Sequence, residues 1–310
     1  MISVSTTARR FGAALALSLT AGLAQANSDV LVSTDWLAGE LDRDDLRVIE
    51  VSVNPGQFER GHIPGAVNLR WHTDLVDTVS RDIVSQENFQ ALLREAGINN
   101  DTDIVLYGDT NNWFAAWGAW IFEIYGVDNV RLLDGGRNKW EAEGRALSPR
   151  QTNYAAGDIT VAAADNSIRA FLPDVVDVAR RDEPNTQLVD IRSAAEYEGR
   201  IIAPDGVAEL AVRAGHIPSA VNVSWGQAVN EDGTFKSADE LRALYADAGV
   251  DGSQPVITYC RIGERSSHTW FALSKILGYD VKNYDGSWTE YGNSVGVPVT
   301  NLAGTVWGGQ

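Results

Sequence analysis

The only cysteine of the chain, Cys260, is followed by two arginines, Arg261 and Arg265. A cysteine reacts as its thiolate, and neighbouring cations favour that ionised form. We therefore interpret Cys260 as a nucleophile and the two arginines as ligands for an anionic substrate. The alternative is that Cys260 is a small buried hydrophobic residue, as many free cysteines are, but its charged neighbours argue against this interpretation.

The residues around Cys260 predict a strand, a loop and a helix. Residues 256–259 form a short apolar, β-branched run typical of a buried strand. Beyond the loop, Trp270, Leu273 and Leu277 recur at helical spacing. A loop that leads into a helix N-terminus presents backbone N–H groups to anions, and the helix dipole adds to the attraction. We thus expect the thiol to ionise below the usual pKa of about 8.5.

The composition limits the classes of protein and partner. The 310 residues suffice for two domains, each with its own core. Apolar residues make up 44% and charged residues 22% of the chain, which is typical of a soluble globular protein. The net charge of −17 disfavours nucleic acid and membranes as partners, because both attract basic proteins. A cationic loop in so acidic a chain indicates a local anion site.

The N-terminus has the pattern of a cleaved secretory signal peptide, which we place at residues 1–26. An Arg-Arg pair precedes the apolar segment 11–24, and an Ala-Gln-Ala cleavage site ends at Ala26. We expect a periplasmic or secreted protein, with general secretion favoured over twin-arginine export. Structural disulfides are usual in such compartments, and one cysteine cannot form one within the chain, which favours a chemical role for Cys260.

The chain contains an internal duplication. The motif Gly-His-Ile-Pro occurs at residues 61–64 and again at residues 215–218. Aligning the strand that precedes Cys260 with its counterpart in the first half places Asp109 at the cysteine's position. The first half then lacks a nucleophile of comparable strength. We expect it to be non-catalytic and to form one wall of a pocket between the halves.

Short apolar strands alternate with amphipathic helices in both halves. This pattern predicts an α/β fold with two domains, each a parallel sheet flanked by helices. We expect a non-catalytic domain over residues 27–150, a linker over residues 151–170 and a catalytic domain over residues 171–310. The linker region is rich in small and polar residues and has little periodicity.

These motifs resemble the rhodanese family, and in particular its two-domain sulfurtransferases. The resemblance covers nearly all of the chain after the signal peptide, and it rests on the paired Gly-His-Ile-Pro motifs, residues 188–192, the Cys-Arg-Ile-Gly-Glu-Arg-Ser loop and residues 283–288. It implies tandem rhodanese-like domains with catalysis in the second. There Cys260 would attack the outer sulfur of thiosulfate, release sulfite and hold a persulfide, which cyanide, a thiol or a protein acceptor then removes.

The resemblance also implies roles for the loop and its surroundings. The loop residues would cradle the persulfide with their backbone N–H groups; besides the two arginines they are Ile262, Gly263, Glu264 and Ser266. The family often has an arginine where this chain has Glu196, and we expect Arg200 to take its place as a substrate ligand. Trp288 is expected to line the pocket, and no cofactor, metal or general base is required.

The histidines receive structural interpretations. His62 and His216 belong to the repeated motif, and we expect both to fix loops rather than to act in catalysis. His268 follows the active loop, and we expect it to be a solvated or capping residue, since no metal-ligand spacing accompanies it.

Three alternatives for the function remain. The cationic loop favours thiosulfate, with 3-mercaptopyruvate as the second choice of donor. A non-catalytic carrier that passes a persulfide to a partner protein would have nearly the same sequence. A cysteine phosphatase is disfavoured, because its loop places the arginine six residues after the cysteine and Arg265 is only five after Cys260.

Overall fold

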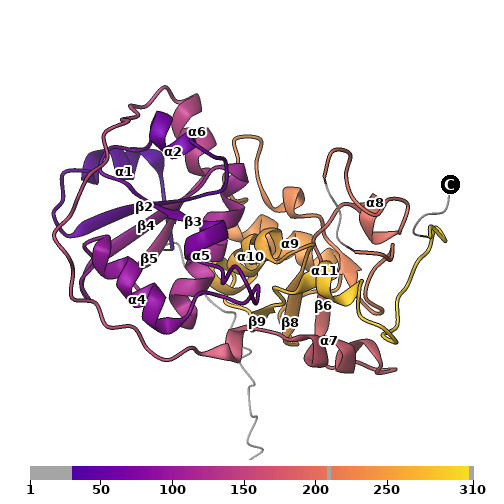
Figure 1. The fold of residues 1–310 in the computed structure, drawn as a ribbon. Coiled ribbons are helices and arrows are strands. Elements are labelled where there is room, and N and C mark those ends of the chain that lie inside the picture. Colours follow the sequence, from indigo (N-terminus) through magenta and orange to yellow (C-terminus); the bar gives the residue numbers. More distant parts are fainter. Residues whose placement is uncertain (1–29, 208–210, 307–310) are drawn as a thin grey trace, which may run out of the picture.

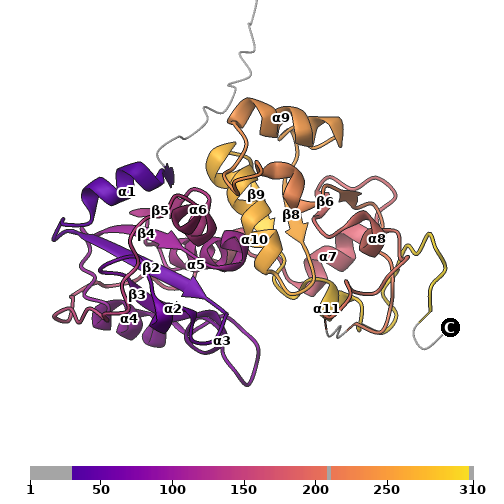
Figure 2. The same cartoon turned by 90° about the horizontal axis from the view of Figure 1, so that it is seen from above.

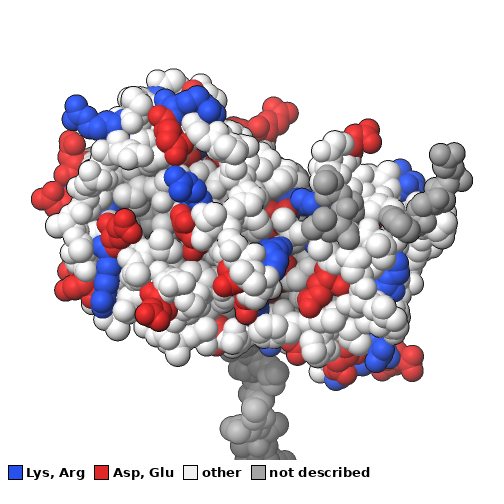
Figure 3. Space-filling view, in the orientation of Figure 1, with Lys and Arg blue, Asp and Glu red and all other residues white. Residues whose placement is uncertain are grey.

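The computed structural model describes residues 30–207 and 211–306. The predicted signal peptide and cleavage site therefore lie outside the described residues. Within the described part, no helix combines the length and the apolar character needed to cross a membrane. On the face drawn in Figure 3, acidic and basic side chains of the described residues are interspersed over both domains.

The chain forms two parallel sheets with helices packed around them, which confirms the predicted α/β fold (Figures 1 and 2). The strand orders are β1-β5-β4-β2-β3 and β7-β6-β8-β9. The first domain contains β1 (Leu31–Val32), α1 (Thr34–Glu40), β2 (Leu46–Ser52), α2 (Gln57–Arg60), β3 (Val67–Arg70), α3 (Trp71–Asp74), α4 (Gln86–Glu95), β4 (Asp103–Tyr107), η2 (Thr110–Asn112), α5 (Trp113–Ile124), β5 (Val130–Leu133) and α6 (Gly136–Ala142). The second contains η3 (Asn166–Ile168), α7 (Leu172–Ala179), β6 (Gln187–Asp190), α8 (Ala194–Tyr197), β7 (Val221–Asn222), η4 (Trp225–Ala228), α9 (Ala238–Asp247), β8 (Val256–Tyr259), α10 (Glu264–Trp270), the π-helical turn η5 (Phe271–Ile276), β9 (Val281–Asn283) and α11 (Ser287–Tyr291).

Burial explains why these runs become central strands. Every residue of β2 and of β8 is buried, as expected for parallel strands that helices cover on both faces. Helix α5 comes after β4 in the first domain, and helix α10 comes after β8 in the second. These two helices pack against each other between the sheets (Figure 2). One hydrophobic cluster consequently runs through both domains, from Trp117 and Trp120 of α5 to Trp270 of α10. The two halves therefore meet through their equivalent helices.

The connection between the domains runs along the first domain without regular structure as far as residue 165. Gly157 N–H donates to Arg94 O at 2.8 Å, and Ala162 N–H donates to Tyr125 O at 2.9 Å. The chain then joins the second sheet, where Arg169 forms a bridge with Asn283 at the end of β9. The connection is thus tied to helices of the first domain and to the sheet of the second.

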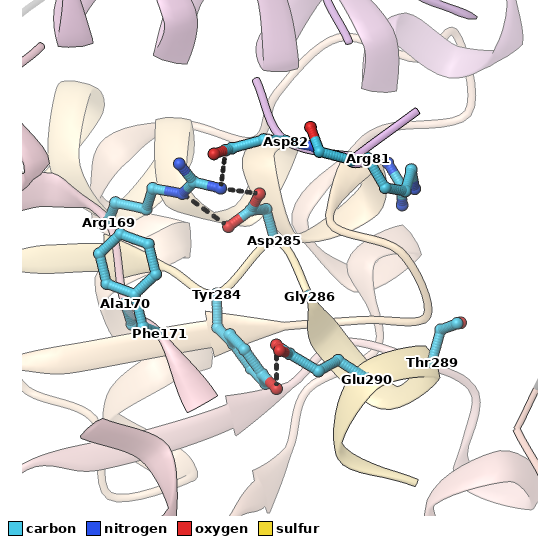
Figure 4. A pocket seen from close by; sticks show the side chains of 11 residues that line it. Arg81, Asp82, Arg169, Ala170, Phe171, Tyr284, Asp285, Gly286, Thr289 and Glu290 are labelled. Carbon is cyan, nitrogen blue, oxygen red and sulfur yellow. Dashed lines mark hydrogen bonds and ion pairs between the residues drawn. The ribbon is translucent and has the colours of Figure 1, made fainter. Parts of the chain in front are cut away.

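A buried arginine in this connection bridges the domains (Figure 4). Arg169 binds Asp285 of the second domain through two hydrogen bonds, of 3.0 and 2.8 Å. The same guanidinium pairs with Asp82 of the first domain at 2.7 Å. Arg169 and Asp285 are both largely buried, so the Asp285 carboxylate depends on this guanidinium for charge compensation. The triad fixes the loop after β9 relative to the first domain.

Replacing Arg169 should be costly for stability. Arg169→Met would leave two carboxylates facing each other, one of them buried, and we expect the free energy of unfolding to fall by about 3 kcal/mol in urea denaturation. Arg181→Met is the matched control, because Arg181 pairs with Asp177 on the surface, where such pairs contribute about 1 kcal/mol or less. Equal effects of the two substitutions would contradict a bridging role for Arg169.

Candidate active site

Cys260 is held by backbone contacts at the end of β8. Its N–H donates to Ser287 Oγ at 3.1 Å, and its carbonyl accepts from Trp288 N–H at 3.0 Å. Thr289 N–H donates to the carbonyl of Arg261 at 2.9 Å. The start of α11 thus fixes the cysteine and the first residue of its loop.

The loop curls back on the sulfur through Gly263. The N–H of Gly263 donates to Cys260 Sγ at 3.1 Å. Gly263 has φ +99°, and a Cβ there would lie 2.6 Å from Trp117 of the first domain and 2.8 Å from Asp285 Cα. Only glycine accommodates both this backbone conformation and these approaches. The cradle therefore closes where the two domains meet.

Side chains of α10 and β9 hold the loop through hydrogen bonds to the carbonyl of Gly263. The carbonyl of Gly263 accepts from Ser266 Oγ at 2.9 Å, from Ser267 Oγ at 2.8 Å and from Asn283 Nδ2 at 3.4 Å. Ser266 Oγ is also 2.6 Å from Asn283 Oδ1. All four residues are buried, so these bonds lie in a water-poor interior and hold one loop conformation.

The surroundings of the sulfur differ from the expected cationic cradle. Cys260 has no exposed surface. Burial raises the pKa of its thiol, and the Glu264 carboxylate raises it further, while Arg265 opposes both effects. Sγ donates to Glu264 Oε2 at 3.5 Å, and Ser287 Oγ lies 4.0 Å away. The prediction of a lowered pKa is therefore wrong for this state, because desolvation and a nearby anion outweigh the guanidinium.

Arg265 approaches the sulfur but has two carboxylate neighbours. Its guanidinium pairs with Glu196 Oε1 at 3.4 Å and with Glu264 Oε1 at 3.8 Å. Although burial acts to raise the pKa of Glu196, Arg265 and the bonds from Ser193 bring it below its usual value. The site is thus close to charge balance. This balance could not be seen in the sequence, where Glu196 was interpreted only as a position at which the family often has an arginine.

Two predicted site residues take other positions. Arg200 pairs with Glu198 at 2.5 Å and 56% of its side chain is exposed; within the described part of the chain, no recorded contact joins it to the loop. Trp288 is fully buried, with its indole N–H donating to Arg213 O at 2.9 Å and the Arg192 guanidinium 4.7 Å from its ring. The prediction that Trp288 lines the pocket is wrong, because its ring packs in the core below the loop.

The first domain supplies an arginine that sequence reasoning missed. Arg81 Nη2 donates to the carbonyl of Ile262 at 3.3 Å, so a cation from the silent half contacts the active loop. Arg81 has φ +65° and sits in a turn whose Val79 and Ser80 N–H groups donate to Asp77 Oδ1. Only the Asp77 turn pattern could have hinted at it, since the contact joins residues far apart in the sequence.

A cavity of about 410 Å³ opens beside this contact, at the boundary between the domains (Figure 4). Arg81 and Asp82 line it from the first domain, and Thr289 and Glu290 from α11. The Arg169–Asp285 pair forms another wall. Cys260 is absent from the lining residues, so the cavity lies next to the loop and does not reach the sulfur.

The counterpart of Cys260 in the first domain is Gly108, and the expected Asp109 lies one residue further on. The Gly108 carbonyl accepts from Arg137 N–H at 3.1 Å, just as that of Cys260 accepts from Trp288 N–H. Tyr107, before Gly108, accepts from Ile63 N–H as Tyr259 does from Ile217 N–H. The sequence alignment of the two halves was shifted by one position. Consecutive apolar residues of a strand can be aligned in two registers, and the sequence does not distinguish between them.

The repeated histidines fix loops, as predicted. His62 Nδ1 lies 2.8 Å from Phe58 O and its ring stacks on Phe58, whereas His216 Nδ1 lies 2.7 Å from Tyr197 O and stacks on Tyr197.

His268 is neither solvated nor capping. It is buried against Phe235, and desolvation lowers its pKa to about 3, so the imidazole is neutral. Across the described residues, no group of three or more His, Cys, Asp and Glu side chains is arranged to hold a metal ion.

The family follows from comparison with known proteins. Residues 33–143 and 177–294 each match the rhodanese-like domain family. The chain is a member of the rhodanese family, with two such domains, and its class is that of the sulfurtransferases.

Relatives extend this assignment. A protein of Saccharopolyspora erythraea named "Putative thiosulfate sulfurtransferase" is 52% identical over 275 residues, which cover 88% of this chain and 96% of that protein. The "Sulfur carrier protein TtuD" of Thermus thermophilus is 50% identical over 277 residues, covering 88% and 97%. The crystal structure of SseA from Escherichia coli, presented as a 3-mercaptopyruvate sulfotransferase, matches with a TM-score of 0.71 at 30% identity, covering 84% and 98%.

The environment of Cys260 predicts that its thiol ionises only at high pH. Because burial raises the pKa of the thiol, the thiol form should persist above neutral pH, and the thiolate should appear at a higher pH than in a free cysteine. Ultraviolet thiolate absorbance measures this directly, since Cys260 is the only cysteine. A midpoint below the ordinary value of about 8.5 would contradict the structure's account of the site.

Proposed function

We propose that this protein is a thiosulfate sulfurtransferase that carries sulfur as a persulfide on Cys260. The observation that carries the proposal is the curled loop, in which the Gly263 N–H donates to Sγ and Arg265 lies alongside. Relatives that carry the name "Putative thiosulfate sulfurtransferase" support the choice of donor.

The reaction proceeds in two displacements. Cys260 Sγ attacks the outer sulfur of thiosulfate, the S–S bond of the donor breaks, and sulfite leaves with the bonding electron pair. Cyanide or a thiol then attacks the outer sulfur of the persulfide, and the persulfide S–S bond breaks with its electron pair going to Cys260 Sγ. Arg265 and Arg261 supply cationic donors for the sulfonate end of the donor and for the departing sulfite.

The donor cannot reach the sulfur in the conformation described, since Cys260 has no exposed surface. The residues that cover Cys260 must therefore move before Sγ can attack thiosulfate. Arg81 donates to the carbonyl of Ile262 through one hydrogen bond, from a turn that is itself exposed at Ser80 and Arg81. An anion arriving at the domain boundary would compete for Arg81, and the loop would then lose its contact with the first domain.

A carrier role is the second candidate, and the Thermus thermophilus relative favours it. A carrier would load one sulfur and release it only to a partner protein, whereas an enzyme turns over many times with small acceptors. Steady-state thiocyanate production from thiosulfate and cyanide separates the two. The loop itself supports thiosulfate over 3-mercaptopyruvate, the donor class of the Escherichia coli neighbour, because two arginines suit a sulfonate.

Loading with thiosulfate should add one sulfur atom to the protein. We expect intact mass spectrometry to show a gain of roughly 32 Da that cyanide removes, as a covalent intermediate requires. Cys260→Ser should abolish both the gain and the turnover while thermal unfolding remains cooperative. Turnover by the serine variant, or a gain that survives cyanide, would rule out the persulfide.

Arg265 should matter for the donor half of the reaction. Arg265→Ala should lower kcat/KM for thiosulfate by about 100-fold, because one charged contact to the developing sulfite is lost. Arg265→Lys keeps the charge without the planar fork and should lose less. Thermal unfolding checks the fold of both variants, and Arg181→Ala is the surface control. An unchanged rate in Arg265→Ala would place the anion site elsewhere.

A further inference from the structure

A carboxylate touches the reactive sulfur, and the proposed displacements leave it without a role. Glu264 is the first residue of α10, and only 3% of it is exposed. Its Oε2 accepts from Cys260 Sγ at 3.5 Å, and its Oε1 lies 3.8 Å from Arg265 Nε. A buried anion beside a nucleophilic sulfur repels the thiolate and the persulfide anion alike, so on electrostatic grounds alone it would slow the reaction.

We propose that Glu264 is the proton acceptor and donor of Cys260, so that it takes the thiol proton on loading and returns it on release. This inference rests on the proposed function. It resolves the conflict between a buried neutral thiol and a reaction that needs a nucleophilic sulfur, since the proton moves within the Sγ–Oε2 hydrogen bond during attack.

The loading step balances with Glu264 in this role. The Cys260 thiol gives its proton to the Glu264 carboxylate as Sγ bonds to the outer sulfur of thiosulfate. The S–S bond of the donor breaks, and sulfite leaves with the electron pair. The products are a persulfide anion on Cys260, a neutral Glu264 carboxyl and sulfite. The neutral carboxyl can donate a hydrogen bond to the persulfide, so the repulsion present in the resting site disappears.

The release step runs in the opposite sense. Cyanide bonds to the outer sulfur of the persulfide, and the persulfide S–S bond breaks towards Cys260. Glu264 returns its proton to the departing Sγ, which restores the neutral thiol and the carboxylate. Thiocyanate is released, and over the cycle no proton enters from solvent or is lost to it.

Among the described residues, Ser266, Ser287 and His268 offer no base to Cys260 Sγ. Ser287 Oγ donates to Tyr284 O at 2.7 Å, and Ser266 Oγ donates to Gly263 O. His268 contacts aromatic rings, and its Nδ1 is without a partner in the described structure. None of these side chains is both basic and in contact with Sγ.

The charges that face the pair come from several elements. Arg265 lies on the same helix, and Glu196 of α8 pairs with the Arg265 guanidinium. Asp285, in the loop before α11, is paired with Arg169. Arg81 reaches the loop from the first domain. Of these groups, Arg265 is the one that contacts Glu264 in the described structure, at 3.8 Å.

The first test measures the contact without sulfur chemistry. Glu264→Gln keeps the shape and removes the charge, so the thiolate should become easier to form. We expect the midpoint of the ultraviolet thiolate absorbance to fall in Glu264→Gln relative to the unaltered protein. Glu290→Gln is the matched control, because that carboxylate accepts from Tyr284 and not from the thiol. Equal midpoints in Glu264→Gln and the unaltered protein would overturn the proposal.

The second test uses the pH profile of single-turnover loading with thiosulfate. With Glu264 as acceptor, the loading rate should vary little with pH around neutrality and below the raised pKa of the thiol, because the proton moves within the site. In Glu264→Gln the thiol must ionise to solvent first, so the rate should rise about tenfold per pH unit up to its new pKa. Glu290→Gln should keep the flat profile.

The outcomes separate this inference from the proposed function. Parallel profiles in the unaltered protein and Glu264→Gln would show that Glu264 moves no proton, even if both proteins load sulfur. If thiosulfate leaves no sulfur on Cys260, the proposed function fails and the proton exchange with the persulfide fails with it. The titration still decides whether Glu264 controls the ionisation of the thiol.

Discussion

The site depends on one hydrogen bond, from the Gly263 N–H to Cys260 Sγ. For this amide to turn towards the sulfur, the loop must adopt a left-handed backbone at Gly263. The carbonyl of Gly263 then points into the protein, where Ser266 and Ser267 donate to it. The short loop therefore works together with Gly263 and the two buried serines to direct the Gly263 N–H at Sγ. Each is needed because the amide must be aimed at a single atom.

Residues of the first domain also hold the active loop in place. Trp117 limits the space at Gly263, Arg81 donates to the carbonyl of Ile262, and Asp82 helps Arg169 to hold Asp285. These contacts come from two separate segments of the first domain. A domain without a nucleophile thus shapes the loop of its twin, and the packing of α5 against α10 keeps the two in place.

Much of this architecture could be predicted from local pattern. The strand before Cys260, the helix after it, the parallel sheets and the paired histidine motifs all depend on periodicity or on short repeated motifs, which a single sequence displays. The charge state of the site could not be predicted, because Glu196 and Arg265 meet only after folding. Trp288 and His268 were placed wrongly for a similar reason. An aromatic ring or imidazole near a functional loop faces the core or the solvent according to tertiary packing, which spacing does not encode.

The position of Gly108 bears on the history of the duplication. If both halves once carried a thiol, the first has lost more than its nucleophile, for a Cβ at Gly108 would lie 2.7 Å from the carbonyl oxygen of Val51 in the neighbouring strand. Reversion to cysteine would force that strand aside and disturb the hydrophobic cluster to which Val51 belongs. A thiol could therefore return at position 108 only together with a shift of the neighbouring strand.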